Sequence, residues 1–219
     1  MSTGEAALPG FAAPRGDAHS HAAGLSEDHA HDASKRIVVG YGFWLFLISD
    51  IILFSAFFAT YAVLSDSTAG GPAGRDLFDL RMVAIETACL LTSSLFCGFA
   101  GIGAQVRSAR LFHGAMLLTF VLGLAFLVIE LHEFAAMVEQ GAGPGRSAFL
   151  SAFFALIGCH GMHVFAGLLW LLTMIAQVMA KGWREDIQRR ILCFNLFWHT
   201  LDIIWVGLFS LVYLVGLAS

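Results

Sequence analysis

The chain has 219 residues, of which 58% are hydrophobic and 13% are charged, and its mean hydropathy is +0.77. This balance excludes an ordinary soluble domain and predicts a helical protein that crosses a membrane several times. A formal net charge of −4, without a basic stripe, excludes nucleic acid as a partner. The four cysteines lie apart inside apolar segments, so we expect buried packing residues and no disulfide framework: Cys89, Cys97, Cys159 and Cys193.

The N-terminal segment, residues 1–36, is polar and rich in Ala, Gly and His, and it lacks the basic-then-apolar pattern of a signal peptide. Two H-x-H pairs, His19 with His21 and His29 with His31, are typical of a metal-binding tail. Because no Cys ligand or fixed scaffold accompanies them, the pattern favours a disordered cytoplasmic arm, and whether its histidines bind metal stays open.

Residues 37–219 form the predicted membrane domain, which is all-α. Each of its apolar segments is long enough to cross the hydrocarbon core, for which about 20 residues suffice. We find no internal repeat, which disfavours a transporter built from inverted repeats. The five predicted spans are approximately 41–64, 82–104, 114–138, 148–179 and 191–217.

Lys and Arg residues fall unevenly on the two sides of these spans. Nine precede the first span or lie in the second and fourth loops: Arg15, Lys35, Arg36, Arg107, Arg110, Lys181, Arg184, Arg189 and Arg190. The other side has three: Arg75, Arg81 and Arg146. Because cytoplasmic loops carry the excess of positive charge, we expect a cytoplasmic N-terminus and a periplasmic C-terminus.

Polar side chains from three spans are expected at one depth. With a rise of about 1.5 Å per residue, Asp50 lies about 14 Å into the first span, and His199 and Asp202 lie about 12 and 16 Å into the last. His160 and His163 fall near the middle of the fourth span. Ionisable groups at membrane depth are costly, so each needs a partner or a purpose.

The spacing of these groups predicts how they meet. His160 with His163, and His199 with Asp202, are i, i+3 pairs that share a helix face. Small residues near the histidines allow another helix to approach closely: Gly158, Gly161 and Gly167. We therefore expect a polar contact between the first, fourth and fifth spans, with the two aspartates as partners of the histidines.

A second polar layer is predicted nearer the outer surface. Glu86 lies in the second turn of its span, and Glu130 and Glu133 share a face near the end of the third, whereas His132 points elsewhere. One of those two glutamates is expected to meet Glu86, and the spacing leaves open which one.

Several chemistries are open to these groups. Hydrogen-bonded contacts that hold helices together are the favoured interpretation, and a proton relay is an alternative. A zinc or iron site, as in an intramembrane metalloenzyme, is a less favoured interpretation, because the sequence contains no H-E-x-x-H or similar motif. Covalent catalysis is unsupported, because no nucleophile elbow accompanies the histidines.

Three motifs resemble subunit III of the haem–copper oxidases. They are GYGFWLFLISDIILF (residues 40–54), GCHGMHV (158–164) and FWHTLDIIW (197–205), and they occur in the family's order. The His-bearing arm, residues 59–64 and residues 68–72 look like the five-span form of bacterial bo-type ubiquinol oxidases in particular.

The matches to the family's motifs also include two departures. Asp50 matches the family's buried acid but stands where many cytochrome c oxidases have Glu, and Glu86 stands where they have Asn. His160, His163, His199 and Asp202 match the family's motif residues, none of which is a redox or metal ligand.

This resemblance implies a non-catalytic subunit of the bacterial inner membrane that supports assembly, lipid binding and stability of a proton-pumping terminal oxidase. No catalytic residue, metal or redox cofactor is expected in this chain. Haem, copper and ubiquinol are expected in partner subunit I, subunit II and a small subunit IV are expected alongside, and bound phospholipid is expected. Subunit III of a cytochrome c oxidase is the alternative, and a free-standing membrane carrier is a more distant one.

Overall fold

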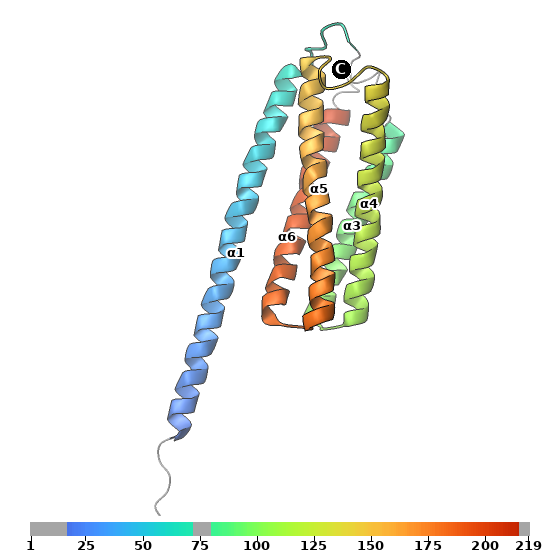
Figure 1. Ribbon diagram of the computed structural model, residues 1–219. Helices are drawn as coiled ribbons and strands as arrows, with labels where there is room; N and C mark the ends of the chain where they lie inside the picture. The colour runs from blue at the N-terminus through green and yellow to red at the C-terminus, as the bar shows by residue number, and fades with distance from the viewer. Residues whose placement is uncertain (1–16, 72–79, 215–219) are drawn as a thin grey trace, which may run out of the picture. The chain divides into compact units, whose positions relative to one another are not determined.

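The computed structural model describes the backbone of residues 17–71 and 80–214, and the side chains of residues 37–71 and 80–213. The described part contains no strand, which confirms the all-α prediction. The elements in chain order are α1 (Asp17–Leu64), α3 (Leu80–Gln105), α4 (Ala109–Glu139), α5 (Ala148–Lys181), α6 (Glu185–Leu208) and a closing π-helix, η1 (Phe209–Leu214) (Figure 1).

Five helices are long and apolar enough to cross a membrane, which confirms the five-span prediction. The last span begins at Glu185, earlier than the predicted residue 191, and its first turn carries Glu185 and Asp186. Acidic residues there complement the positive end of the helix dipole, a signal that hydropathy alone leaves out. The described spans are Ile37–Leu64, Leu80–Gln105, Ala109–Glu139, Ala148–Lys181 and Glu185–Tyr213.

The chain divides into two compact units, residues 1–42 and residues 43–219. In the first unit, helix α1 already begins at Asp17, inside the segment for which the sequence predicted a disordered arm. The Ala-rich composition of this segment gives it helix propensity that an argument from polarity overlooks. Its four histidines lie outside the residues whose side chains are described, so the division at residue 36 and their solvated state stay predictions.

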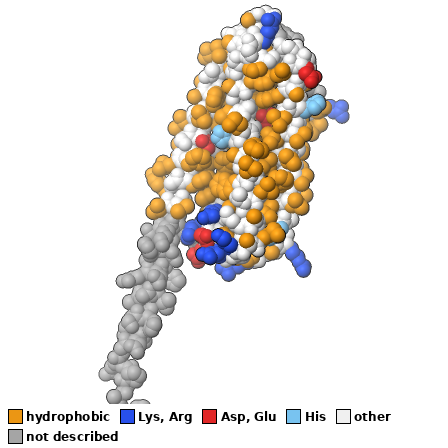
Figure 2. All heavy atoms as spheres, viewed as in Figure 1, with side chains coloured by type: hydrophobic (Ala, Val, Ile, Leu, Met, Phe, Trp, Pro, Cys, Tyr) orange, Lys and Arg blue, Asp and Glu red, His pale blue; other side chains and the backbone are white. Residues whose placement is uncertain are grey.

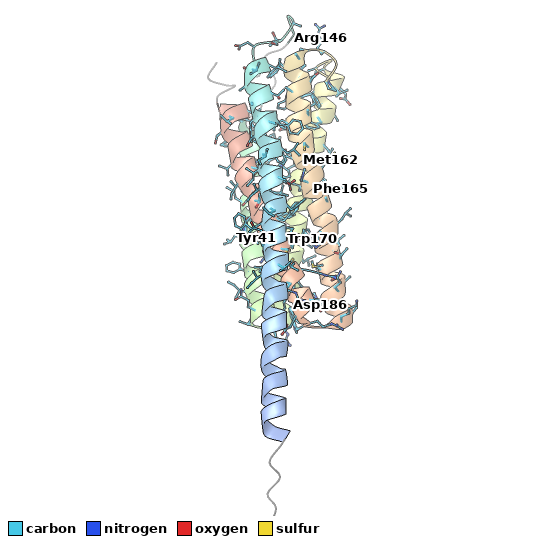
Figure 3. All side chains as sticks on the ribbon, turned by 90° about the vertical axis from the view of Figure 1, so that its left-hand side faces the viewer. Tyr41, Arg146, Met162, Phe165, Trp170 and Asp186 are labelled. Carbon is cyan, nitrogen blue, oxygen red and sulfur yellow. The ribbon has the colours of Figure 1, made fainter. Side chains whose placement is uncertain are left out.

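In the second unit, α3, α4, α5 and α6 form a bundle. Helix α3 packs against α4 and α6, and α5 packs against the same two helices, so the four close into a ring (Figure 1). Arg146 and Asp186 lie at opposite ends of the bundle, with Met162 and Phe165 between them on α5 (Figure 3). Hydrophobic side chains cover most of the visible face of this unit, and Lys and Arg side chains gather toward its ends (Figure 2). This distribution suits a protein that spans a bilayer.

Residues 43–64 of α1 join the bundle through widely spaced aromatic contacts. The Phe43 ring lies 5.9 Å from that of Trp170, and the Tyr61 ring lies 5.9 Å from that of Phe149. Most other large apolar side chains of this segment are exposed: Trp44, Leu45, Phe46, Ile48, Ile51, Ile52, Leu53 and Val63. This part of α1 therefore presents a broad apolar surface to its surroundings.

The connection from α4 to α5 contains the residues that end one helix and begin the next. Gly141 adopts a φ of +76°, and the Ala142 N–H donates to the Met137 carbonyl at 2.9 Å, which together end α4 in a Schellman-type turn. Ser147 then caps α5, because its hydroxyl accepts a hydrogen bond from the Leu150 N–H at 3.1 Å.

Trp198 of α6 holds the four-helix bundle together. Its ring fills notches at two glycines: an added Cβ atom would lie 3.0 Å from the ring at Gly123 of α4 and 2.9 Å from it at Gly167 of α5. The indole N–H donates to the hydroxyl of Ser93 on α3 at 3.1 Å. One fully packed side chain thus contacts all three neighbouring helices.

Replacing Gly167 by alanine is expected to destabilise the subunit, because the new methyl group overlaps the Trp198 ring and overpacking typically costs about 1–3 kcal/mol. The measurement is thermal unfolding of the purified protein, followed by the fluorescence of its tryptophans. Gly98→Ala on α3 is the matched control, since no atom lies within 4 Å of an added Cβ there. Equal unfolding temperatures for the two variants would contradict the packing role assigned to Gly167.

Candidate functional site

His160 of α5 lies at the centre of the bundle and is fully buried. Its Nε2–H donates to the backbone carbonyl of Leu201 on α6, at 3.3 Å. Aromatic rings surround it: Phe126 lies edge-on at 5.7 Å, Trp205 at 5.2 Å and Phe54 of α1 at 6.3 Å, all between ring centroids. Within the described part of the chain, the Nδ1 atom has no hydrogen-bond partner.

His163 faces α1. Its Nδ1–H donates to the Cys159 carbonyl of its own helix at 2.7 Å, and its ring lies edge-on to that of Phe54 at 5.2 Å. Asp50 of α1 interacts electrostatically with His163, but no hydrogen bond or ion pair at contact distance joins them among the described interactions. The predicted proximity of the first and fourth spans therefore holds, with aromatic packing as its main contact.

His199 and Asp202 face α3. The Nδ1 atom of His199 lies 2.7 Å from the hydroxyl of Ser94, which also approaches the carboxylate of Asp202. One turn earlier on α6, Asn195 accepts a hydrogen bond from the Cys97 thiol at 3.1 Å. The Oδ1 atom of Asp202 has no hydrogen-bond partner in the described part of the chain.

The polar groups that were predicted at one depth thus form two separate sets: His160 and His163 on α5, and His199 with Asp202 on α6 facing α3. Asp202 was one candidate partner of the histidines; its carboxylate and His199 both approach the Ser94 hydroxyl of α3. The i, i+3 spacing correctly places His199 and Asp202 on one face, but it does not say which neighbouring helix that face meets. His160, by contrast, reaches α6 through the backbone of Leu201.

The hydroxyl partners of these α6 side chains were not predicted from the sequence. Trp205 donates its indole N–H to the Thr87 hydroxyl of α3 at 3.0 Å, and the Phe126 ring stands edge-on to it at 4.7 Å. Ser93 and Ser94, which pair with Trp198 and His199, are small hydroxyl residues without a spacing signal. Trp198 and Trp205 both lie in the motif at residues 197–205, and this position could have indicated that their side chains matter for packing.

The outer layer is a cluster of acids beside a tyrosine. Glu86 is fully buried, and neither of its carboxyl oxygens has a hydrogen-bond partner in the described part of the chain. Glu133 and Glu130 lie within electrostatic range of it. Tyr213, on the π-helical end of the last span, is buried within electrostatic range of the same three acids. Which of the two glutamates contacts Glu86 directly stays a prediction.

What the two layers can do chemically follows from these contacts. In the described residues, no group of three or more His, Cys, Asp and Glu side chains is arranged to hold a metal ion. The polar groups instead join helices through carbonyl, hydroxyl and indole partners, and the acids of the outer layer can hold protons. The arrangement defines a multi-pass helical membrane protein with polar contacts between its spans.

Comparison with known proteins identifies the family. Residues 20–217 match the family described as cytochrome c oxidase subunit III. The chain belongs to this family, the third subunit of the haem–copper oxidases, and is a multi-pass protein of the bacterial inner membrane. The resemblance of the three motifs is confirmed.

Individual relatives cover nearly the whole chain. It is 47% identical to the cytochrome bo(3) ubiquinol oxidase subunit 3 of Pseudomonas aeruginosa, over 91% of this chain and 94% of that protein. The protein of the same name from Pseudomonas putida is 46% identical, over 85% of this chain and 89% of the relative. The cytochrome c oxidase subunit 3 of Bacillus sp. (strain PS3) is 40% identical, over 81% and 86%.

Replacing Ser94 by alanine is expected to destabilise the α3–α6 interface, because it leaves the half-buried polar groups of His199 and Asp202 without this partner, at a cost of about 1 kcal/mol. Thermal unfolding of the purified protein measures the effect. The control is Ser55→Ala, since that exposed hydroxyl bonds to the Ile51 carbonyl of its own helix. A loss no larger in Ser94→Ala than in Ser55→Ala would argue against the interhelical role.

Proposed function

We propose that this chain is subunit III of a bacterial bo-type ubiquinol oxidase. In this proposal the complex oxidises quinol, reduces oxygen to water and translocates protons across the inner membrane. The observation that carries it is the match, at 46–47% identity and over most of both chains, to proteins named as cytochrome bo(3) ubiquinol oxidase subunit 3.

The chain's own role in this proposal is non-catalytic. Haem, copper and quinol bind in subunit I, and subunit II and a small subunit IV complete the complex. The contacts of the interior support this division: His160 and His163 each direct a ring nitrogen to a backbone carbonyl, and Trp198 and Trp205 each reach a hydroxyl of α3. Groups engaged in this way hold helices in place.

Phospholipid is the proposed companion of α1. The segment from Phe43 to Leu64 contacts α5 through a few aromatic rings and exposes large apolar side chains elsewhere. Contact between these side chains and lipid hydrocarbon avoids the free-energy penalty of exposing them to water. In this proposal Asp50, Phe54 and His163 fix the position of α1 against α5 and so shape the cleft in which lipids lie.

The proposed topology has the N-terminus in the cytoplasm and the C-terminus in the periplasm. The turns that join α3 to α4 and α5 to α6 lie at one end of the bundle and carry Arg107, Arg110, Lys181 and Arg184. The α4–α5 connection at the other end carries Arg146. Positive charge gathers on the cytoplasmic side of membrane proteins, which supports this orientation.

Cytochrome c is the second candidate electron donor of the complex. The observation that favours it is the 40% identity to the Bacillus relative named cytochrome c oxidase subunit 3. The relatives with higher identity favour quinol.

Co-purification tests the proposed function. An affinity tag on this chain in mild detergent is expected to bring down a haem- and copper-containing partner, and the preparation is expected to consume oxygen with ubiquinol and not with reduced cytochrome c. Oxygen uptake with cytochrome c alone would support the second donor, and a chain that purifies without haem would contradict both.

Replacing Asp50 by asparagine is expected to weaken retention of this subunit, or of its lipids, while leaving the haem spectrum of the complex unchanged. The substitution replaces the carboxyl group that lies within electrostatic range of His163 by an amide of nearly the same size. Subunit stoichiometry after a detergent wash, read beside the visible spectrum, measures both effects. A fully assembled complex that has lost its haem signal would overturn the non-catalytic role.

A further inference from the structure

His199 lies at the middle of the last span. The span runs from Glu185 to Tyr213, so about 21 Å of helix axis separates His199 from either end. Because the hydrocarbon core of a bilayer is about 30 Å thick, this side chain is near its centre. Ionisable side chains rarely face lipid at that depth, since hydrocarbon offers them no hydrogen-bond partner.

Only one nitrogen of the His199 ring has a partner inside the subunit. Nδ1 lies 2.7 Å from the Ser94 hydroxyl, which holds the ring against α3. Nε2 has no hydrogen bond to the described residues and, unlike the Oδ1 atom of Asp202, it is not enclosed by them. The side chain is half-buried, so Nε2 is accessible at the outer surface of the bundle.

The outward face of α6 around His199 is apolar. Leu192, Ile203 and Val206 are 58%, 73% and 45% exposed, and with His199 they recur at intervals of seven, four and three residues. This is the spacing of a coiled-coil seam, along which a second helix packs lengthwise. One polar residue within such a seam specifies which partner binds and in which register.

Helix α3 borders this seam with a notch at Gly98. Gly98 is four residues after Ser94, so the two share a helix face, and no atom lies within 4 Å of a Cβ atom added at Gly98. Small residues let transmembrane helices approach closely. The notch leaves room beside His199 for the side chains of a neighbouring helix.

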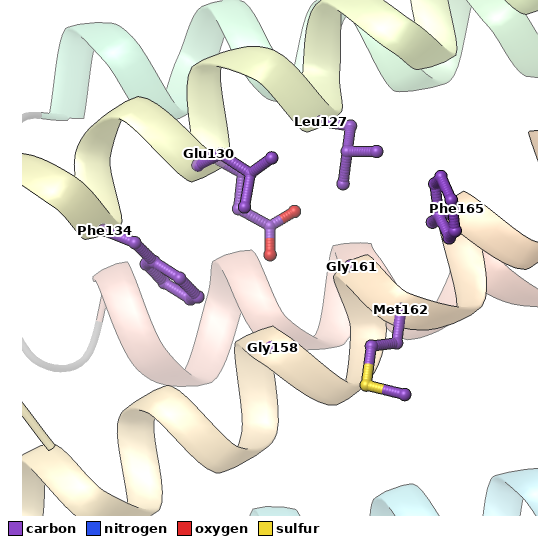
Figure 4. Close-up of a pocket in the computed structure, with 8 residues that line it drawn as sticks. Leu127, Glu130, Phe134, Gly158, Gly161, Met162 and Phe165 are labelled. Atoms are coloured by element: carbon purple, nitrogen blue, oxygen red, sulfur yellow. The ribbon is translucent and has the colours of Figure 1, made fainter.

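The groove between α4 and α5 presents a different kind of surface (Figure 4). Its lining is apolar or glycine except for Glu130, which is only 4% exposed. Met162, which is 74% exposed, borders the same groove. Hydrocarbon alone is a sufficient cover for that groove, whereas at the α3–α6 face it would leave Nε2 of His199 without a partner.

We propose that Leu192, His199, Ile203 and Val206 of α6, together with Gly98 of α3, form a docking face for a transmembrane helix of another oxidase subunit. The partner helix presents apolar side chains along the seam and one hydroxyl side chain to Nε2 of His199. A hydroxyl suits this position because it both donates and accepts, whichever ring nitrogen carries the proton. This docking face rests on the proposed function, which supplies the other subunits.

Site-directed photo-crosslinking tests the docking face in the whole purified complex. Ile203→benzoylphenylalanine is expected to form a discrete adduct with a peptide of another subunit, located by mass spectrometry. Met162→benzoylphenylalanine is the matched control, because that residue is as exposed as Ile203 and borders the apolar groove, and it is expected to react with lipid. An adduct of position 203 with lipid alone, or with a second copy of this chain, would overturn the docking face.

Haem content and oxygen uptake of the same preparation distinguish this inference from the proposed function. A complex that contains haem and oxidises ubiquinol, yet gives no subunit adduct at position 203, would overturn the docking face and leave the proposed function intact. A chain that purifies without haem would contradict the proposed function and the docking face with it.

Two substitutions of His199 separate the roles of its two nitrogens. The side-chain amide of Asn reaches the place of Nδ1, and that of Gln reaches the place of Nε2. His199→Asn is therefore expected to keep the Ser94 contact but to lower retention of the subunit after a detergent wash about fivefold, the effect of one lost hydrogen bond. His199→Gln is expected to keep the subunit in the complex. Equal retention of the two variants would contradict the role of Nε2.

Two open glycines supply a steric test that leaves the packing of the subunit itself unchanged. No atom lies within 4 Å of an added Cβ at Gly98 of α3 or at Gly114 of α4. Gly98→Leu fills the notch and is expected to lower retention of the subunit, whereas Gly114→Leu, away from the docking face, is expected to leave it unchanged. Normal retention of Gly98→Leu would overturn the docking face.

Discussion

The insertion of Trp198 into two glycine notches is the contact on which the bundle depends. Gly123 and Gly167 let α4 and α5 approach the same indole ring from two sides, and its N–H ties Ser93 of α3 to the same point. In a bilayer, apolar side chains gain little by leaving lipid for protein, so helices are held by close packing and by hydrogen bonds between them. Trp198 supplies both at once, and Trp205 adds a second indole hydrogen bond to α3 further along α6.

The polar side chains of the interior differ in whether their hydrogen-bonding atoms have partners. His199 has the Ser94 hydroxyl at 2.7 Å and His163 has the Cys159 carbonyl at the same distance. Glu86 and Glu130 retain oxygens without a hydrogen-bond partner among the described residues. The satisfied groups account for how the helices are placed. The unsatisfied acids lie within electrostatic range of each other, and Glu130 borders the groove between α4 and α5.

Hydropathy predicts the five spans well, because a stretch of about 20 apolar residues has few alternatives to a membrane helix. Depth along the helix also places His160, Glu86 and Glu130 in the interior, where the structure buries them. What the sequence cannot supply is the rotation of each helix about its axis, since a spacing of three residues defines a face and not the neighbour of that face. That is why the partner of His199 is Ser94 of α3, a residue without any pattern of its own.

The sparse attachment of α1 also bears on how the protein is made. The segment from Phe43 to Leu64 is translated before the other described spans. The rings it packs against belong to Phe149, His163 and Trp170, about 90 to 130 residues later in the chain. This segment therefore meets its ring partners on α5 only after the two intervening helices have been made. Until α5 is inserted, this segment of α1 is surrounded by lipid, and its exposed apolar side chains are stable in that environment.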